Sequence, residues 1–217
     1  MVRQREIKIC CISSHEESRV AIDAGADILG LVSAMPSGPG VIHEELIASI
    51  ARSVSAQTFL LTSLCEPDAI IAQHRRLGTT AIQLCDALPP DSHLQLREAL
   101  PGIRLVQVVH VTGEASYDEA MAAARDVDAL LLDSGNPALR VKELGGTGRV
   151  HDWTISRRIA SDAGVPVFLA GGLRPENVAE ALEITGASGV DICSGVRTDG
   201  RLDREKLERF IGAVRAF

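Results

Sequence analysis

The sequence predicts a single (β/α)8 barrel, and three observations lead to that prediction. Short apolar runs alternate with amphipathic segments from one end of the chain to the other, which is typical of parallel strands joined by helices. The unit of a strand followed by a helix occurs eight times. No linker, low-complexity stretch or change of composition divides the 217 residues, so we expect one domain over residues 1–217.

The predicted strands are short apolar runs bounded by turn residues. They are Ile7–Ile12, Ile28–Ser33, Thr58–Thr62, Ala81–Leu84, Arg104–Val109, Ala129–Asp133, Val167–Ala170 and Gly189–Cys193. Pro166 precedes the seventh strand, where its missing N–H does least harm to the hydrogen-bonded ladder. An open doubly wound sheet is the rival architecture, but no G-x-G-x-x-G sequence follows the first strand.

The predicted helices each carry one polar face. They are Glu16–Ala24, His43–Val54, Pro67–Leu77, Ser92–Ala99, Ser116–Arg125, Thr154–Ala163, Pro175–Thr185 and Arg204–Val214. Proline followed by an acid predicts the helix starts at Pro67 and Pro175, and Asp203 stands where the last helix needs an N-cap.

The composition excludes several classes of partner. The net charge of −7 and the pI near 5.4 argue against nucleic acid or an anionic membrane, because either would favour a basic surface. The first residues alternate in charge and lead into a short apolar strand, so we expect neither a signal peptide nor a membrane span, and a cytoplasmic protein. The sequence does not distinguish a monomer from a homodimer.

The five cysteines show no C-x-x-C spacing. We therefore expect free thiols rather than a disulfide framework, and no metal site. The catalytic groups of barrels of this kind lie at the carboxyl ends of the strands. This sequence places Cys10, Cys11, Cys85, Asp86, His110, Asp133, Cys193 and Ser194 there.

A thiol facing a carboxylate provides a general base and a general acid. For any one of these cysteines, burial as a small core residue is the competing interpretation. His110 is expected to be a wall of the pocket or a hydrogen-bonded core histidine rather than a ligand.

Three glycine-rich turns predict a phosphate site. The first is Gly145-Gly146-Thr147-Gly148, the second follows the seventh strand at Gly171-Gly172, and the third follows the eighth at Ser194-Gly195. Phosphate sites of these barrels are frequently built from the loops after strands seven and eight, where backbone N–H groups are free of Cβ obstruction.

Several motifs in order along the chain resemble the phosphoribosylanthranilate isomerase family of tryptophan biosynthesis. They are Lys8-Ile9-Cys10, AGAD at 24–27 with LG at 29–30, Gln83-Leu84, LLLDS at 130–134, GGTG at 145–148 with Asp152-Trp153, LAGGLRPENV at 169–178 and VDICSGV at 190–196. The resemblance covers nearly the whole chain. It implies an Amadori rearrangement without a cofactor, acting on a phosphorylated small molecule.

By this resemblance Cys10 is the general base and Asp133 the general acid. Asp133 would protonate the ribose ring oxygen, and Cys10 would then remove the C2′ proton from the opened iminium. The resemblance assigns the phosphate to backbone groups of Gly146, Gly148, Gly171, Gly172, Ser194 and Gly195. It assigns further substrate contacts to Lys8, Gln83 and Thr147.

Several positions depart from the family pattern, among them Cys85 and Asp86, which stand where the family has histidine and glycine after Gln83-Leu84. Cys11 stands where the family usually has glycine, and Gly40 where an arginine that pairs with the anthranilate carboxylate is expected. Asp86 adds an acid near an anionic ligand, and Arg197 replaces a glutamate. Arg174 and Arg197 are both expected to be solvated surface charges. The Gly40 and Asp86 departures leave open a paralogue that isomerises a different phosphoribosyl amine, and a non-catalytic phospho-ligand binding protein is the remaining alternative.

Overall fold

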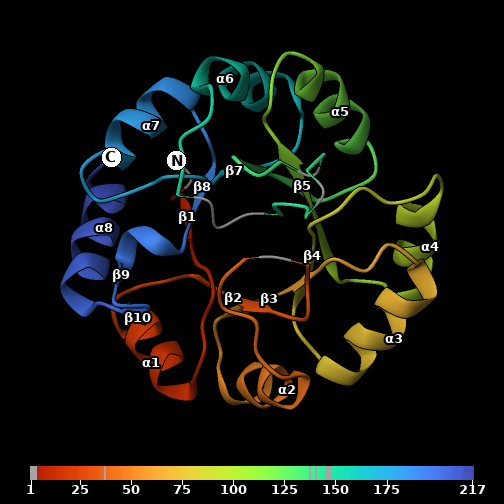
Figure 1. The fold of residues 1–217 in the computed structure, drawn as a ribbon, viewed down its shortest axis with the longest axis horizontal. Helices are drawn as coiled ribbons and strands as arrows, with labels where there is room; N and C mark the ends of the chain where they lie inside the picture. Colours follow the sequence, from red (N-terminus) through yellow and green to blue (C-terminus); the bar gives the residue numbers. More distant parts are fainter. Residues whose placement is uncertain (1–3, 37, 137, 140, 145–147) are drawn as a thin grey trace.

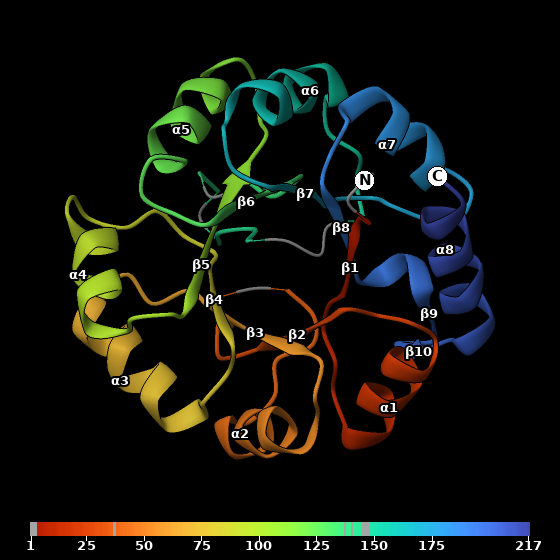
Figure 2. The ribbon, with the colours of Figure 1, turned by 180° about the vertical axis from the view of Figure 1, so that it is seen from behind.

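The structure is a computed structural model that describes residues 4–36, 38–136, 138–139, 141–144 and 148–217. Within these residues, eight parallel strands form a closed barrel in the order in which they occur along the chain. Figure 1 shows the helices arranged as a ring around the strands, and Figure 2 shows the same ring from behind. The predicted (β/α)8 barrel is confirmed.

The barrel strands are β1 (Glu6–Ile9), β2 (Ile28–Val32), β3 (Gln57–Thr62), β4 (Ala81–Leu84), β5 (Arg104–His110), β6 (Ala129–Asp133), β7 (Val167–Leu169) and β8 (Gly189–Ile192). The surrounding helices are α1 (His15–Asp23), α2 (Glu44–Ser53), α3 (Pro67–Leu77), α4 (Ser92–Ala99), α5 (Ala115–Ala123), α6 (Trp153–Asp162), α7 (Val178–Thr185) and α8 (Arg204–Ala216). Side chains alternate between the barrel interior and the layer under the helices because the strand repeat is two residues.

Two hydrophobic clusters fill the layer between strands and helices, and a third occupies the barrel interior. At the amino-terminal end of the barrel, Arg104 makes a bidentate ion pair with Glu6 and lies against the rings of Phe59 and Phe168. The opposite end, where the strands finish, is left for the functional groups.

Two predicted boundaries are wrong for reasons that the structure shows. The first strand ends at Ile9 rather than Ile12, because Cys11 has a φ of 61° and leaves the extended conformation. Helix α7 begins at Val178 rather than Pro175, because the Asn177 side chain accepts from Arg174 N and donates to the Gly172 carbonyl, which forms a turn first.

The chain after β8 also forms elements that the sequence pattern does not indicate. A single 3₁₀ turn, η1 (Ser194–Val196), leads into a small antiparallel pair, β9 (Arg197–Thr198) and β10 (Arg201–Leu202). The predicted N-cap of α8 is confirmed, since the Asp203 side chain accepts from Lys206 N. No helix in the described ranges is long and apolar enough to cross a membrane.

Candidate active site

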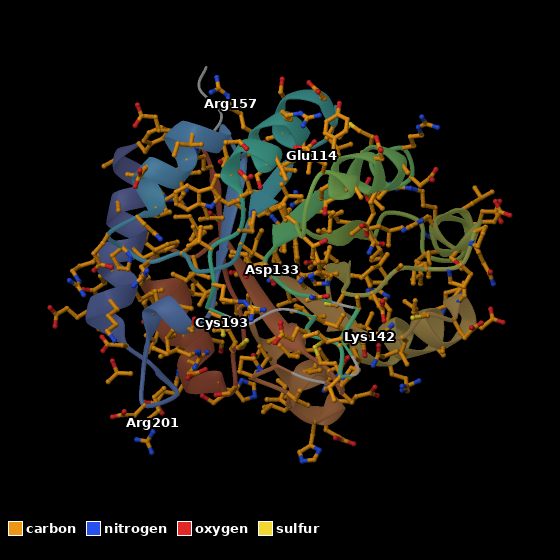
Figure 3. The ribbon with its side chains drawn as sticks, turned by 45° about the horizontal axis from the view of Figure 1, so that its top comes forward. Glu114, Asp133, Lys142, Arg157, Cys193 and Arg201 are labelled. Carbon is orange, nitrogen blue, oxygen red and sulfur yellow. The ribbon has the colours of Figure 1, made fainter. Side chains whose placement is uncertain are left out.

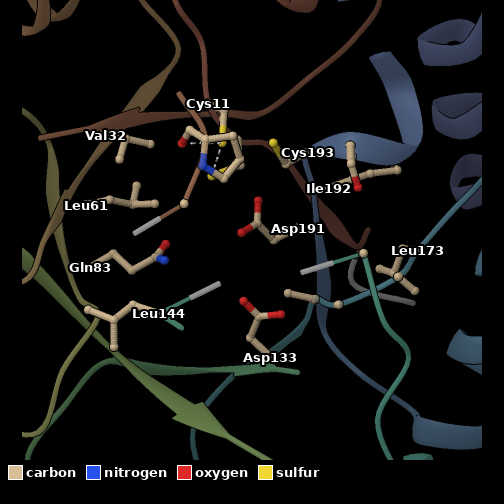
Figure 4. Close-up of a pocket in the computed structure, with 18 of the residues that line it drawn as sticks. Cys11, Val32, Leu61, Gln83, Asp133, Leu144, Leu173, Asp191, Ile192 and Cys193 are labelled. Carbon is tan, nitrogen blue, oxygen red and sulfur yellow. Dashed lines mark hydrogen bonds between the residues drawn. The ribbon is translucent and has the colours of Figure 1, made fainter. Parts of the chain in front are cut away.

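A pocket opens at the carboxyl ends of the strands (Figure 4). It is lined by residues from seven of the eight strand ends and their loops: Cys10, Cys11, Val32, Met35, Gly38, Pro39, Leu61, Gln83, Asp133, Leu144, Gly148, Ala170, Gly171, Gly172, Leu173, Asp191, Ile192, Cys193 and Ser194. The predicted base and the predicted acid therefore share one cavity. The carboxylates of Asp133 and Asp191 both point into it (Figure 4).

Cys10 lies in the pocket wall beside the buried ammonium group of Lys8. A Cβ atom added to Gly30 on β2 would lie 3.0 Å from Lys8 Nζ and 3.1 Å from Cys10 Sγ, so both groups border the same small space. The absence of a side chain at Gly30 is what admits the sulfur atom. The predicted general base therefore has a buried positive charge beside it.

Lys8 itself is fully buried and does not line the pocket. Its Nζ lies 2.8 Å from Asp191 Oδ2, between β1 and β8. Burial by itself would lower the pKa of Lys8, but the negative charge of Asp191 and the nearby Cys10 raise it above the ordinary lysine value. Lys8 therefore carries its charge throughout the neutral range. The other oxygen, Asp191 Oδ1, has no hydrogen-bond partner and belongs to a pocket-lining residue.

Asp133 ends β6 and is 8% exposed, with its carboxylate at the pocket surface. Its Oδ1 accepts from the Ser134 backbone N–H at 2.7 Å, which fixes the direction of the group. Gly171 lies over the same oxygen with a φ of 81°, and a Cβ there would come within 3.1 Å of it. A side chain at position 171 would both strain the backbone and displace the acid.

The described phosphate candidates gather at one end of the pocket. Gly148, Gly171, Gly172 and Ser194 all line it, and a Cβ on Gly148 would lie 3.7 Å from Ser194 Oγ. Gly195 does not line the pocket, because its backbone packs against the Leu173 carbonyl. Gly146 and Thr147 lie outside the described residues. Described parts of the three predicted glycine turns, which come from separate parts of the sequence, thus meet in space.

The remaining wall is mostly apolar. Val32, Met35, Pro39, Leu61 and Leu144 supply it, and such a surface suits a flat aromatic ring. The described lining residues include no lysine or arginine.

Gln83 reaches this region from β4 and is almost fully buried. Its Oε1 has no hydrogen-bond partner, so an acceptor is available to a ligand hydroxyl or N–H group.

The two positions that depart from the family pattern in the first and second loops, Cys11 and Gly40, are neighbours in space. A Cβ on Gly40, which has a φ of 80°, would lie 2.4 Å from Cys11 Cβ, so the side chain of Cys11 occupies the space next to residue 40. The Cys11 thiol lies 3.8 Å from Cys10 Sγ and 3.5 Å from the Pro39 carbonyl. Its hydrogen bonds with Cys10 and then Cys193 raise the pKa of Cys11, so this thiol remains protonated.

The two charged residues that depart from the family pattern, Asp86 and Arg197, have ion-pair partners that the sequence did not predict. Asp86 forms an ion pair with Lys142, which neutralises the extra acid beside the pocket. Arg174 is exposed, as expected, but the prediction for Arg197 is wrong because its side chain is only 10% exposed. Arg197 lies behind the first loop, paired with Glu17, and does not line the pocket.

The other candidates are structural. His110 is buried with its Nε2 3.2 Å from the Cys85 carbonyl, which confirms a hydrogen-bonded core histidine. Burial raises the pKa of Cys85 to about 12, so it is an inert core thiol. All five cysteines are free. Among the described residues, no group of three or more histidine, cysteine or acidic side chains is arranged to hold a metal ion.

Two site residues were missed by the sequence reasoning, Asp191 and Gly30. The signal for Asp191 was present, since Lys8 and Asp191 are opposite charges inside apolar runs of the first and last strands. In a closed barrel those two strands are neighbours. Gly30 had no comparable signal, because its role depends on what packs against it.

Comparison with known proteins gives a consistent result. A family model described as N-(5'phosphoribosyl)anthranilate (PRA) isomerase matches residues 7–213. An N-(5'-phosphoribosyl)anthranilate isomerase of Methanocella arvoryzae is 33% identical over 213 residues, which cover 96% of this chain and 97% of that protein.

Solved structures agree. The phosphoribosyl anthranilate isomerase of Thermotoga maritima superposes with a TM-score of 0.84 at 25% identity, covering 99% of this chain and all of that one. A phosphoribosyl anthranilate isomerase in complex with reduced 1-(o-carboxyphenylamino)-1-deoxyribulose 5-phosphate has a TM-score of 0.81 at 24% identity, with 99% of this chain and all of that one covered.

Proposed function

Since the chain belongs to the N-(5′-phosphoribosyl)anthranilate isomerase family, we propose that Cys10 and Asp133 catalyse the rearrangement of N-(5′-phosphoribosyl)anthranilate to the corresponding 1-deoxyribulose 5-phosphate. The observation that carries the proposal is the shared pocket. A thiol that follows β1 and a carboxylate that ends β6 line one cavity, together with glycine turns and several apolar side chains.

The first step opens the sugar. The Asp133 carboxyl group gives its proton to the ring oxygen, the bond from that oxygen to C1′ breaks, and the lone pair of the amine nitrogen forms an iminium. Asp133 suits this role because Ser134 and Gly171 hold one of its oxygens in place. A positioned acid of this kind contributes a factor of roughly 10²–10⁴ to a rate.

The second step moves the C2′ proton. The iminium withdraws electrons and acidifies C2′, so the Cys10 thiolate can take the proton, and the bonding electrons form an enolamine. Loss of the C2′ hydroxyl proton and protonation at C1′ give the aminoketone. One carbon is oxidised and its neighbour is reduced within the same molecule, so the electrons balance without an external acceptor. Lys8 supports this step by placing a positive charge beside the sulfur.

The two ends of the pocket hold the substrate. We assign the phosphate to the backbone N–H groups around Gly148, Gly172 and Ser194, and the aromatic ring to the apolar wall that includes Met35 and Leu61. Support for this assignment comes from the lining of the cavity, which includes both glycine turns and large apolar side chains.

Direct assay tests the function. Purified protein is mixed with freshly prepared N-(5′-phosphoribosyl)anthranilate, and loss of the substrate's fluorescence is followed. We expect a kcat/KM of roughly 10⁴ M⁻¹s⁻¹ or more. Absence of turnover by folded protein would refute the proposal, and a value hundreds of times lower would point to a different amine as the natural substrate.

A further inference from the structure

The loop after β1 is held from behind by an arginine that the mechanism does not use. Arg197, the first residue of β9, donates from Nη2 to the Cys11 carbonyl at 2.6 Å and lies 3.4 Å from the Cys10 carbonyl. Its Nη1 lies 2.8 Å from Glu17 Oε1. One guanidinium group thus joins the catalytic loop to helix α1.

The guanidinium is itself held in place. Glu17 is 13% exposed and accepts from the Ser13 backbone N–H at 2.9 Å, the Ser13 hydroxyl at 3.0 Å and the Leu202 N–H at 3.0 Å. Nη1 of Arg197 also donates to the Gly200 carbonyl. Because its partners are anchored in different elements, Arg197 has little freedom to leave the Cys11 carbonyl.

Cys11 needs such a hold because its backbone is left-handed, with a φ of 61°. L-residues with a Cβ rarely adopt this conformation, and cysteine has no side-chain amide or carboxylate to support it locally. Two backbone N–H groups near Cys11 are held by the barrel, because Cys10 N donates to the Ile192 carbonyl and Ile12 N donates to the Gly30 carbonyl. The Cys11 carbonyl is directed to Arg197.

We propose that Arg197 is a positioning residue for Cys10: by holding the Cys11 carbonyl, it maintains the left-handed backbone at Cys11 and so directs the Cys10 sulfur into the pocket. The proposal rests on the proposed function in that it takes Cys10 as the base. Arg197 lies outside the pocket and contributes to proton transfer only through the position of Cys10. Substrate binding at the far end of the pocket does not involve it.

A double-mutant cycle between Arg197 and Cys11 tests the proposal. The proteins are wild type, Arg197→Met, Cys11→Gly and the double variant, with Arg201→Met as the matched control. Arg201 lies on the same hairpin, is exposed and points outward at the edge of the molecule (Figure 3), so its substitution removes the same charge without touching the loop.

In the wild-type background, Arg197→Met is expected to lower kcat about tenfold or more, with KM changed by less than about threefold. In the Cys11→Gly background the same substitution should lower kcat by less than about threefold, because glycine adopts the left-handed conformation without the Cβ penalty. Arg201→Met should leave kcat unchanged. An equal loss in both backgrounds would show that Arg197 only anchors the hairpin, and a loss confined to KM would assign it to binding; either result overturns the proposal.

A replacement variant and a second measurement test the same proposal independently of Arg197→Met and of turnover. If Arg197→Met does not fold, Glu17→Gln replaces it, because this variant keeps the guanidinium and removes the negative charge that pairs with it. The rate of Cys10 alkylation by iodoacetamide, located by mass spectrometry, tests the geometry without turnover. A wild-type protein that fails to isomerise refutes the proposed function alone. An alkylation rate at Cys10 that is the same in wild type, Arg197→Met and Glu17→Gln refutes the positioning role.

Discussion

The ammonium of Lys8 lies 2.8 Å from the carboxylate of Asp191, and this buried ion pair joins β1 to β8 where the barrel closes. The register pairs the same two residues across the ladder. Asp191 reaches the pocket, whereas Lys8 lies beneath it beside Cys10. The pair therefore links closure of the barrel to the electrostatics around the Cys10 thiol.

Replacing one partner of this pair should destabilise the fold. Lys8→Met leaves the Asp191 carboxylate buried without its cation, which typically costs about 3–5 kcal/mol. Urea unfolding at pH 7 measures the change. The double variant Lys8→Met/Asp191→Leu should recover most of the loss, since an apolar pair of similar volume has no charge to desolvate. A double variant as unstable as the single one would contradict this account.

Removing either of the two groups proposed to transfer protons should lower the turnover rate strongly and leave ligand affinity nearly unchanged. Cys10→Ser and Asp133→Asn are each expected to lower kcat by roughly 10²-fold or more. Affinity for the reduced product analogue, measured by calorimetry, should change little because the phosphate and ring contacts remain. Cys65→Ser is the control, since that thiol is free and lies outside the pocket. Near wild-type rates in either catalytic variant would remove the mechanism.

Gly30 should not tolerate a methyl group. Gly30→Ala places a Cβ 3.1 Å from Cys10 Sγ and 3.0 Å from Lys8 Nζ, so the sulfur has to move. We expect kcat to fall about tenfold or more, because proton transfer depends on sub-ångström placement. Gly113→Ala is the matched control, as a Cβ there meets nothing within 4 Å. Equal kinetics for the two variants would exclude a positional role for Gly30.

The Glu17–Arg197 pair should make stability depend on pH in a defined direction. Burial by itself would raise the pKa of Glu17, but hydrogen bonds from Arg197 and two backbone N–H groups lower it below the ordinary value. A carboxylate with a lowered folded-state pKa stabilises the fold above its unfolded pKa of about 4.3, and this contribution is lost as the pH falls through the folded-state value.

The unfolding free energies of wild type and Arg197→Met should therefore differ most above about pH 4.3 and converge below it. Urea unfolding at several pH values from neutral to acidic measures both curves. A constant difference across this range would show that the pair contributes through packing alone.

Helix α8 offers a stabilising substitution far from the pocket. Gly212 is exposed within the helix, and a Cβ there would meet nothing within 4 Å. Gly212→Ala should raise the free energy of unfolding by about 0.5–1 kcal/mol, because alanine loses less backbone entropy in a helix. Thermal unfolding checks the sign, and kcat should stay at the wild-type value. A destabilised variant would contradict the helical environment at this position.

Much of the fold was predictable because its signals are local. The run from Ala129 to Leu132 has no polar face, so it predicted a buried strand, and the structure gives β6 the same bounds as the prediction. Proline followed by an acid predicted the start of α3 correctly. The same signal failed at Pro175, because an asparagine side chain closes a turn there before the helix begins.

The sequence predicted which residues line the candidate site better than it predicted the contacts among them. The repeat of strand and helix placed Cys10 and Asp133 at strand ends, and barrel geometry brings strand ends together, so their shared pocket followed from the pattern. The sequence predicted that Arg197 is a surface charge, because no residue near it in the sequence indicates that Glu17 and the Cys11 carbonyl surround it.

The sequence by itself determined the order of strands and helices, the single barrel and the two groups proposed to transfer protons. Only the tertiary structure decided that Lys8 pairs with Asp191, that Gly30 makes room for the Cys10 sulfur and that Arg197 holds the Cys11 carbonyl. The reason is physical. The hydrophobic periodicity of the sequence indicates whether each residue is buried or exposed. These contacts instead join residues far apart in the chain, which become neighbours only when the barrel closes.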